Sequence, residues 1–250
     1  MRIAIIGYGK MGHMIEEVAL ERGHSIACAI DRIADRPLTL TDRSADRPAM
    51  PVRLFSPEEG FTSEEFRSAD VAIEFTTPAT AKDNILRAWA QGVPVISGST
   101  GWKPEELKIE DLSLKIEGNK TIISNEAGKV MLVWSSNYSV GVNITFELNK
   151  ILAQMMSTQP QYTPSIKEIH HIHKLDKPSG TAKTLAKDIE DLRLKIDDLK
   201  IESVREGEVP GTHIVTWDSE EDTIVLTHIA KGRRGFALGA VLAAEEILNI

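Results

Sequence analysis

A glycine-rich turn near the N-terminus constrains the fold of this chain more than any other feature. The turn follows a short apolar run at residues 2–6 and has the spacing Gly-x-Gly-x-x-Gly. Its residues are Gly7, Tyr8, Gly9, Lys10, Met11 and Gly12. In this pattern the first glycine permits a tight turn, the second lets a pyrophosphate approach the backbone, and the third lets helix and strand pack closely. The spacing therefore predicts the opening of a dinucleotide-binding βαβ unit.

The second predicted strand ends in an acid at the distance that such a unit requires. An apolar run at residues 25–30 is followed directly by Asp31 and Arg32. A carboxylate at this point accepts hydrogen bonds from the adenosine ribose hydroxyls of NAD. The Arg32 guanidinium could hold the 2′-phosphate of NADP or stack on adenine. The expected cofactor is therefore NADH, NADPH or both.

Strands and helices alternate through the rest of the first half of the chain. Apolar strands are predicted at residues 69–76, 93–97, 121–124 and 130–134. Helices are predicted at residues 78–91 and 105–118, and residues 33–64 read mainly as a connection with a short strand near 52–54. This alternation predicts an α/β fold with a parallel sheet and right-handed crossovers. Such sheets bind ligands at the carboxyl ends of their strands.

One loop at such a strand end is a candidate for the nicotinamide side of the site. It follows the strand at residues 93–97 and contains Gly98, Ser99 and Thr100. An ordinary Gly/Ser loop is the alternative interpretation of the same residues. The position of the loop favours a nucleotide contact.

The second half of the chain has a different pattern. A helical period at residues 143–156 is followed by alternating strands at residues 200–205, 213–217 and 223–230, with turn residues between them. This pattern predicts a smaller α+β domain with an open mixed sheet. An open sheet with an apolar face needs a cover, and self-association is the simplest one.

The change of pattern divides the chain into two domains. Residues 1–137 are expected to bind the dinucleotide, and residues 138–235 to bind substrate and to oligomerise. A final helix within residues 236–250 is expected to pack back on the first domain.

Composition and charge exclude several classes of protein. The 250 residues carry a net charge of −8, which argues against a general nucleic-acid binder. The first strand begins at Arg2 and no apolar run reaches membrane-spanning length, so neither a signal peptide nor a membrane partner is expected. The single cysteine, Cys28, fits a reducing compartment. We expect a cytoplasmic protein with a small-molecule partner.

The chemistry-bearing stretch is residues 168–182. It contains three histidines, Lys174 and the turn Pro178-Ser179-Gly180-Thr181 ahead of a predicted helix. A helix N-terminus binds anions through its unpartnered N–H groups, and histidine or lysine can supply a proton. Several cations could form a local basic pocket, namely Lys174, Lys177, Lys231, Arg233 and Arg234. The stretch therefore indicates a carboxylate- or phosphate-bearing substrate that receives a proton.

Two other interpretations of this stretch stay open at the level of sequence. Alternation at residues 165–170 indicates a strand, so His170 and His171 could be ordinary strand-end residues. A metal could also be held by His171 and His173 with His170. Cys28 is distant and no HExxH or CxxC spacing occurs, so no metal is expected.

The combined motifs resemble those of a known family. The spacing Glu168-x-His170-His171-x-x-Lys174-x-Asp176-x-Pro178-Ser179-Gly180-Thr181-Ala182 is similar to the signature of the 4-hydroxy-tetrahydrodipicolinate reductases (dihydrodipicolinate reductases) of lysine biosynthesis. Further matching stretches are residues 7–12, 136–143, 205–207 and 236–241. The resemblance covers essentially the whole chain in order.

The resemblance implies a fold, an activity and a set of site residues. It implies a Rossmann domain with a smaller domain that builds a homotetramer, and NAD(P)H-dependent reduction of a dicarboxylate ring in diaminopimelate and lysine biosynthesis. His170 and Lys174 match the proton donors. The positions implied for the substrate are His171, Gly180, Thr181 and Arg233. The further nucleotide-contacting positions implied are Gly98, Ser99, Thr100, Ser135, Ser136, Asn137 and Tyr138.

Two alternative functions are weaker but distinct. An NAD(P) oxidoreductase similar to aspartate dehydrogenase would share the Rossmann half, but it does not explain residues 174–181. A non-enzymatic scaffold that senses NAD(P)H has no evident use for the proton donors.

Overall fold

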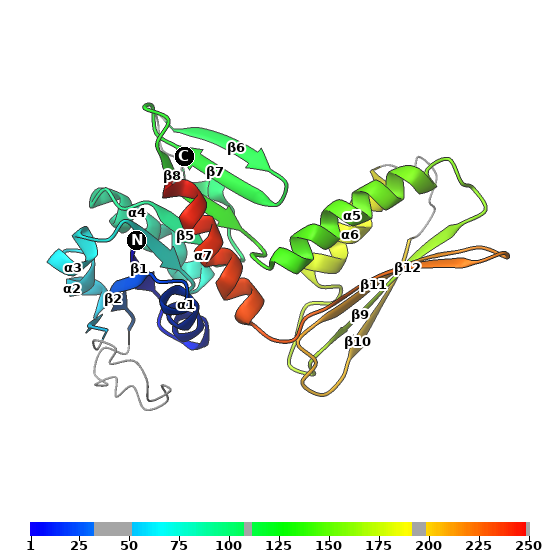
Figure 1. Cartoon of the computed structure of the whole chain (residues 1–250), viewed down its shortest axis with the longest axis horizontal. Helices are drawn as coiled ribbons and strands as arrows, with labels where there is room; N and C mark the ends of the chain where they lie inside the picture. Colours follow the sequence, from blue (N-terminus) through cyan, green and yellow to red (C-terminus); the bar gives the residue numbers. More distant parts are fainter. Residues whose placement is uncertain (33–51, 108–111, 192–198, 249–250) are drawn as a thin grey trace. The chain divides into compact units, whose positions relative to one another are not determined.

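The computed structural model describes residues 1–32, 52–107, 112–191 and 199–248. The chain forms two compact units (Figure 1). Unit 1 comprises Met1–Tyr138 together with Phe236–Ile250, and unit 2 comprises Ser139–Gly235.

Unit 1 is built on an eight-stranded sheet in the order β3-β2-β1-β4-β5-β8-β7-β6. Its strands are β1 (Arg2–Ile6), β2 (Ser25–Ile30), β3 (Leu54–Phe55), β4 (Val71–Glu74), β5 (Val95–Ser97), β6 (Ser113–Glu117), β7 (Lys120–Ser124) and β8 (Val130–Ser135). The pairs from β3 to β8 are parallel, whereas β7 and β6 are antiparallel. Successive strands are added on one side of β1 as far as β3 and on its other side from β4 onwards, so the strand order changes direction at β1. This confirms the predicted Rossmann-like α/β fold.

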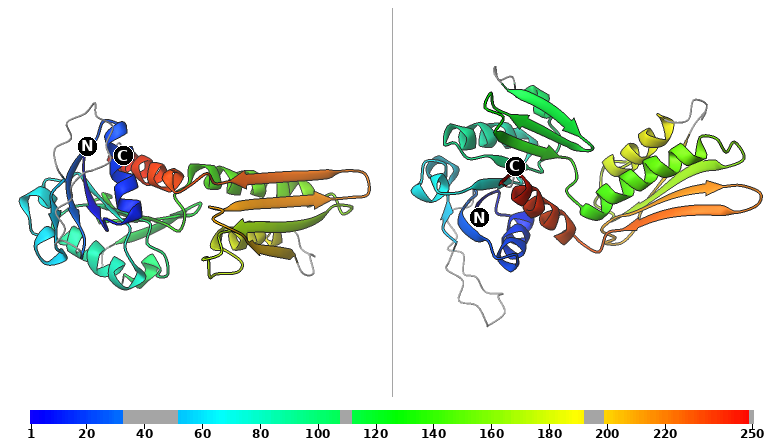
Figure 2. Two further views of the ribbon diagram at one scale, coloured as in Figure 1. Left: turned by 90° about the horizontal axis from the view of Figure 1, so that it is seen from below. Right: turned by 45° about the horizontal axis from the view of Figure 1, so that its top comes forward.

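Helices cover both faces of this sheet (Figure 2). The helices of unit 1 are α1 (Lys10–Glu21), α2 (Pro57–Gly60), α3 (Glu64–Arg67), α4 (Pro78–Ala90) and α7 (Arg234–Leu248). One core layer joins the sheet to α1 and α7 through residues such as Ile15 and Val241. The other joins it to α4 through residues such as Ile85. The final helix is therefore part of the core of unit 1.

One sequence-based prediction in unit 1 is wrong. The helix predicted over residues 105–118 is replaced by a short 3-10 turn, Pro104–Glu106, and by strand β6. The β6 sequence Ser-Leu-Lys-Ile-Glu alternates in polarity and pairs antiparallel with β7, so a period of two decides its structure. Residues 108–111 of the predicted helix lie outside the described residues.

The predicted connection over residues 33–64 is only partly described. Residues 33–51 lie outside the described residues. Beyond them, β3 is followed by the short helices α2 and α3. Ser56 and Ser63 cap these helices by accepting the N–H groups of Glu59 and Phe66.

Unit 2 is a four-stranded mixed sheet with two helices on one face. Its elements are α5 (Val140–Met156), β9 (Thr163–His170), α6 (Gly180–Glu190), β10 (Lys200–Arg205), β11 (Thr212–Asp218) and β12 (Thr223–Ile229). The strand order is β10-β9-β11-β12, and only the β9–β10 pair is parallel. Val142, Leu185 and Trp217 are among the residues that join α5 and α6 to the sheet. The predicted open mixed sheet is confirmed.

Strand β9 alternates strictly between its two faces, and this positions two residues of the chemical stretch. Pro164, Ile166, Glu168 and His170 are buried on the face that α5 and α6 cover, whereas the residues between them are only partly buried. A glutamate and a histidine therefore lie in line with the apolar core, where each needs a polar partner.

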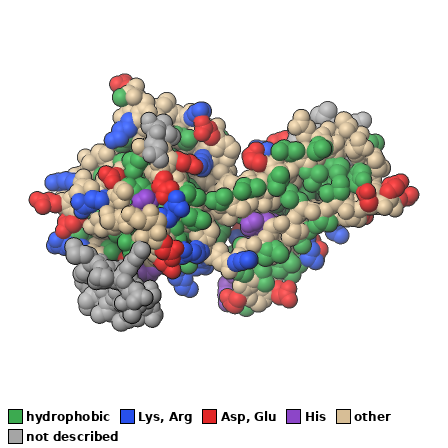
Figure 3. Space-filling view, in the orientation of Figure 1, with side chains coloured by type: hydrophobic (Ala, Val, Ile, Leu, Met, Phe, Trp, Pro, Cys, Tyr) green, Lys and Arg blue, Asp and Glu red, His purple; other side chains and the backbone are tan. Residues whose placement is uncertain are grey.

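The outer surface of α5 is unusually apolar. Side chains spaced three or four residues apart are exposed along it, and Figure 3 shows hydrophobic atoms gathered over this helix. They are Val140, Ile144, Leu148, Ile151 and Met155. Among the described residues, no helix combines the length and apolarity needed to cross a membrane.

Candidate functional site

The glycine turn of unit 1 has the shape that a pyrophosphate needs. Gly7 has φ +91°, and a Cβ there would clash with the carbonyl oxygen of Phe75. Gly9 is the N-cap of α1, and a Cβ built on it would meet nothing within 4 Å. The first turn of α1 contains no acidic residue. Open space above the start of a helix with no negative side chain fits a bound phosphate group.

Asp31 lies beside this turn, as predicted. Its Oδ2 atom accepts a hydrogen bond from the backbone N–H of Tyr8 at 2.6 Å. Arg32 follows it and is exposed. The residues present therefore fit an adenine dinucleotide, with a carboxylate next to the turn for the ribose hydroxyls.

A buried glutamate that sequence reasoning missed joins the ends of β4 and β5. Glu74 is 0% exposed and accepts hydrogen bonds from Ser97 Oγ at 2.6 Å, Ser99 Oγ at 2.8 Å and the Thr76 N–H at 3.0 Å. The Thr76 hydroxyl also donates to it. The side chain of Ser99 therefore points into this cluster, so only its backbone is left for the predicted nucleotide contact.

The other predicted nucleotide loops lie next to this cluster. Trp134 Nε1, at the end of β8, donates to the carbonyl oxygen of Ser99 at 2.9 Å. The Tyr138 hydroxyl is buried and donates to the carbonyl oxygen of Val133 at 2.7 Å, and burial raises its pKa well above the usual value. The phenol thus anchors the loop within unit 1. Ser136 and Thr100 are exposed at the same edge of the sheet.

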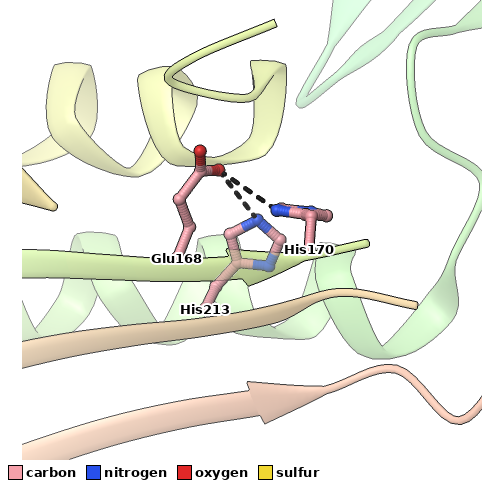
Figure 4. A group of neighbouring side chains, drawn as sticks. All are labelled: Glu168, His170 and His213. Atoms are coloured by element: carbon pink, nitrogen blue, oxygen red, sulfur yellow. Dashed lines mark ion pairs between the residues drawn. The ribbon is translucent and has the colours of Figure 1, made fainter. Parts of the chain in front are cut away.

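Unit 2 holds a buried group of one carboxylate and two imidazoles (Figure 4). Glu168 Oε2 lies 3.5 Å from His170 Nδ1 and 3.9 Å from His213 Nε2. Glu168 is 0% exposed, and both histidines are also buried. The two rings meet edge to face with centroids 5.0 Å apart.

Strong donors stabilise the Glu168 carboxylate. The Ser179 N–H lies 3.1 and 3.0 Å from its two oxygens, and Arg205 Nη2 lies 3.0 Å from Oε1. Burial by itself raises the pKa of Glu168, but hydrogen bonds from Ser179, Ser203 and Arg205 outweigh it and lower the pKa to about 2. Glu168 is therefore ionised at every physiological pH.

Burial lowers the pKa of both imidazoles. Burial, reinforced by the neighbouring His170, lowers the pKa of His213 to about 4. Burial also lowers the pKa of His170, although the Glu168 carboxylate opposes this shift. His213 Nε2 lies 3.2 Å from Ser179 Oγ, which in turn accepts the Ala182 N–H at 3.2 Å. The cluster thereby ties β11 to the start of α6.

Lys174 lies in the turn that follows β9. Its N–H donates to the carbonyl oxygen of His171 at 3.1 Å, and its Nζ atom lies 2.8 Å from Asp176 Oδ1. The side chain of Arg205 crosses the same turn, because its Nε donates to the carbonyl oxygen of Lys174 at 3.1 Å. The predicted proton donor is thus held close to the buried cluster.

Helix α6 begins where the sequence predicted an anion site. Ser179 is its N-cap, Gly180 and Thr181 are its first residues, and its first turn contains no acidic residue. His171 is partly buried. Arg233 is exposed in the turn before α7, and no hydrogen bond or ion pair joins it to another described residue. Its predicted place near the substrate stays a prediction.

The cluster also contains the residue types of a metal site. One ligand atom from each of Glu168, His170 and His213 lies within 4.8 Å of the others. However, Ser179 and Arg205 already donate to the carboxylate, and the guanidinium is a fixed positive charge that opposes a cation. This donor set favours a hydrogen-bonded cluster. The expectation of no metal stays a prediction.

Glu168, Arg205 and His213 were not among the predicted site residues. The period of two in β9 could have placed Glu168 on the same face as His170. Arg205 and His213 come from strands β10 and β11, where the pairing register sets them opposite His170 and Glu168. Nothing in the local sequence signals that register.

Comparison with known proteins covers both units. The family model for the N-terminus of dihydrodipicolinate reductase matches residues 1–138, and the model for its C-terminus matches residues 141–249. The 4-hydroxy-tetrahydrodipicolinate reductase of Christiangramia forsetii is 38% identical over 98% of this chain and 91% of its own length. That of Archaeoglobus fulgidus is 31% identical over 100% of this chain and 95% of its own length.

A solved structure has a similar fold. Dipicolinate-bound dihydrodipicolinate reductase from Paenisporosarcina sp. TG-14 superposes with a TM-score of 0.75 at 21% identity, covering 100% of this chain and 95% of that one. The two family models match the two halves of the chain in order, which agrees with this structural similarity. The chain therefore belongs to the dihydrodipicolinate reductase family.

Proposed function

We propose that this protein is an NAD(P)H-dependent oxidoreductase that reduces 4-hydroxy-tetrahydrodipicolinate to tetrahydrodipicolinate in lysine biosynthesis, with the 4-hydroxyl group leaving as water. The observation that carries the proposal is the stretch from His170 to Thr181. It combines buried imidazole, an ammonium group and a helix N-terminus, and it lies in a chain whose two halves both match the family.

Unit 1 provides the binding site for the cofactor. Bound NAD(P)H supplies the hydride that reduces the ring. The N-terminus of α1 would hold the pyrophosphate, Asp31 would accept from the adenosine ribose, and the loops that Glu74 joins would lie on the nicotinamide side. Arg32 is exposed beside Asp31, which supports use of NADPH as well as NADH.

Lys174 is the proposed proton donor. Hydride addition places negative charge on the substrate ring, which a nearby acid must neutralise. Burial lowers the pKa of His170, which favours Lys174 over His170 as the donor. Asp176 Oδ1 lies 2.8 Å from the Nζ atom of Lys174 and orients this side chain. His170 then acts as a hydrogen-bonding partner of the substrate.

The substrate carboxylates are proposed to bind at the start of α6. The N–H groups of Gly180 and Thr181 belong to its first turn, where the helix dipole favours negative charge. His171 and Arg233 are proposed as further contacts. Fixing both carboxylates orients the ring, and such positioning lowers the activation free energy by several kcal/mol.

The test is oxidation of NADH and of NADPH, followed by absorbance, with freshly generated 4-hydroxy-tetrahydrodipicolinate. Substrate-dependent oxidation is expected, and Lys174→Ala should lower turnover roughly 10²–10⁴-fold. No oxidation with either cofactor, in protein that binds NAD(P)H, would reject the proposed reaction. Comparison of the two cofactors measures the contribution of Arg32.

We also propose that the protein is a cytoplasmic homotetramer. The face of the unit 2 sheet opposite α5 and α6 includes Val225 and Ile229, which are 54% and 64% exposed. Together with the apolar surface of α5, this supports self-association. Light scattering should give a molar mass equal to that of four chains. The double variant Val225→Glu with Ile229→Glu should have a lower molar mass.

Neither alternative function is favoured. An activity similar to that of aspartate dehydrogenase would share the Rossmann half but does not explain residues 174–181, and an NAD(P)H sensor has no evident use for the proton donors. The family match extends over residues 141–249 as well. Binding of NAD(P)H without turnover of the proposed substrate would favour one of these two alternative functions instead.

A further inference from the structure

Arg205 makes an unusual set of contacts for a residue outside the predicted site. Its side chain is only 7% exposed. Its Nε atom donates to the carbonyl oxygen of Lys174 at 3.1 Å, and its Nη2 atom donates to the carbonyl oxygen of Asp176 and to Glu168 Oε1. One guanidinium thus connects two carbonyl groups of the Lys174 turn to a buried carboxylate on β9.

These contacts need the shape of arginine. A guanidinium presents five N–H groups in a fixed plane, whereas an ammonium group is a point charge with rotating donors. Arg205 lies at the end of β10, opposite His170 in the parallel pairing with β9. The plane of its guanidinium can therefore reach the turn beyond β9 and the carboxylate within β9 at once.

Other contacts also join the turn to the segment after β10, one of them the ion pair between His173 Nε2 and Glu208 Oε1 at 3.5 Å. Two are backbone hydrogen bonds, from the Ile172 N–H to the carbonyl oxygen of Gly207 and from the Glu206 N–H to that of His170. Both lie at the start of the turn. Between Lys174 and Asp176, the contacts with β10 come from Arg205.

We propose that Arg205 is the positioning residue for Lys174. By holding the carbonyl groups on either side of the Lys174–Asp176 ion pair, it sets where the ammonium group lies. Glu168 neutralises its charge and fixes the guanidinium plane, since Ser179 holds the carboxylate from the other side. The inference rests on the proposed function, in which Lys174 delivers the proton.

The first test measures the turn itself and needs no substrate. Arg205→Lys keeps the positive charge beside Glu168 but cannot serve all three acceptors. Amide hydrogen exchange of residues 171–178 should become roughly tenfold faster, because a hydrogen-bonded restraint is lost. The matched control is Arg67→Lys, since Arg67 is exposed on α3 and donates to Gln91 Oε1 at 2.8 Å.

The second test measures what the movement does to the reaction. Arg205→Lys should lower kcat roughly 100-fold, because displacement of about 1 Å at a reacting group has an effect of this size. The dissociation constant for NADH should stay at the wild-type value, since the predicted nucleotide contacts are all in unit 1. A purely structural defect would instead lower the melting temperature and kcat and raise the dissociation constant for NADH.

The outcomes separate this inference from the proposed function. If wild-type protein does not turn over the substrate, the proposed function fails, while the exchange experiment still tests the turn. If wild-type protein is active and Arg205→Lys keeps the wild-type kcat or unchanged exchange at residues 171–178, the inference is wrong.

A second variant covers the case in which Arg205→Lys does not fold. Glu168→Gln with Arg205→Gln removes both charges together, so no buried charge is left unpaired. The same loss of kcat is expected in this folded double variant. Wild-type kcat in it overturns the role of Arg205.

Discussion

Among the described residues, each unit contains one glutamate that is 0% exposed near the carboxyl end of a strand, and the two are held in different ways. Glu74 in unit 1 accepts from the hydroxyl groups of Ser97 and Ser99 and from the Thr76 N–H. Glu168 in unit 2 accepts from the Ser179 N–H and from the Arg205 guanidinium, and two imidazoles lie beside it.

The difference follows what each site has to do. Around Glu74, neutral donors join two loops at the edge of the sheet where the cofactor is proposed to bind. Around Glu168, charged and titratable groups surround the turn that carries the proposed proton donor. The carboxylate of Glu74 is thus held by neutral donors, whereas that of Glu168 is paired with a guanidinium.

The largest expected effect is that of Glu168→Ala on stability. The substitution leaves the buried Arg205 charge without its partner, which typically costs about 3–5 kcal/mol of unfolding free energy. Urea unfolding followed by far-UV circular dichroism measures it. Arg205→Met added to Glu168→Ala should recover part of the loss. A cost below about 1 kcal/mol for the single variant contradicts the charge pairing.

The next effect is a loss of stability in acid that belongs to unit 2. The pKa of His213 is about 4 in the folded chain against 6.5 ordinarily, so the unfolded chain takes up the proton first and stability falls as the pH drops from 6.5 to 4. Glu168, with a pKa of about 2 against 4.5, adds a further loss from pH 4.5 towards 2.

His213→Gln separates the first window from the second. It should reduce the fall in unfolding free energy between pH 6.5 and 4 by up to about 3 kcal/mol. The loss of stability below pH 4.5 should remain. Denaturant unfolding at pH 7, 5 and 4 gives the slopes. An unchanged slope between pH 6.5 and 4 shows that another group is responsible.

Glu74→Ala should cost less than Glu168→Ala. The Ser97, Ser99 and Thr76 hydroxyls can rotate towards other acceptors, and the Thr76 N–H keeps a second acceptor, Ser99 Oγ at 2.8 Å. The expected loss is about 1–3 kcal/mol, measured by the same urea titration. Glu74→Gln, which keeps an acceptor oxygen, is the milder control. Equal costs for the two alanine variants would remove the contrast between the glutamates.

The smallest effect on stability is expected for Gly9→Ala. No atom lies within 4 Å of the new methyl group and φ is −84°, so the unfolding free energy should change by less than about 1 kcal/mol. The affinity for NADH should nevertheless fall at least about tenfold, because the methyl group occupies the space of the pyrophosphate. Titration of nucleotide fluorescence measures it. The control is Gly232→Ala, which also has open space; unchanged affinity in Gly9→Ala argues against the assigned nucleotide position.

Local spacing in the sequence determined much of the fold and part of the site. The glycine turn after β1, the acid after β2 and the cap before α6 are short-range patterns, and the structure has all three where they were expected. Alternation in β9, β11 and β12 was likewise sufficient to predict the mixed sheet. The same criterion failed at residues 105–118, where alternation over β6 was taken for part of a helix.

Only the tertiary structure decided which groups meet. Glu168 and Arg205 are 37 residues apart, and Ser179 and His213 are 34 apart, so their contacts depend on strand register and on how α6 packs on the sheet. A sequence records the period of each element and the chemistry of its turns. The partner of a buried charge is chosen by the pairing of distant segments, because each burial site must satisfy its own charge with whatever the neighbouring strands bring to it.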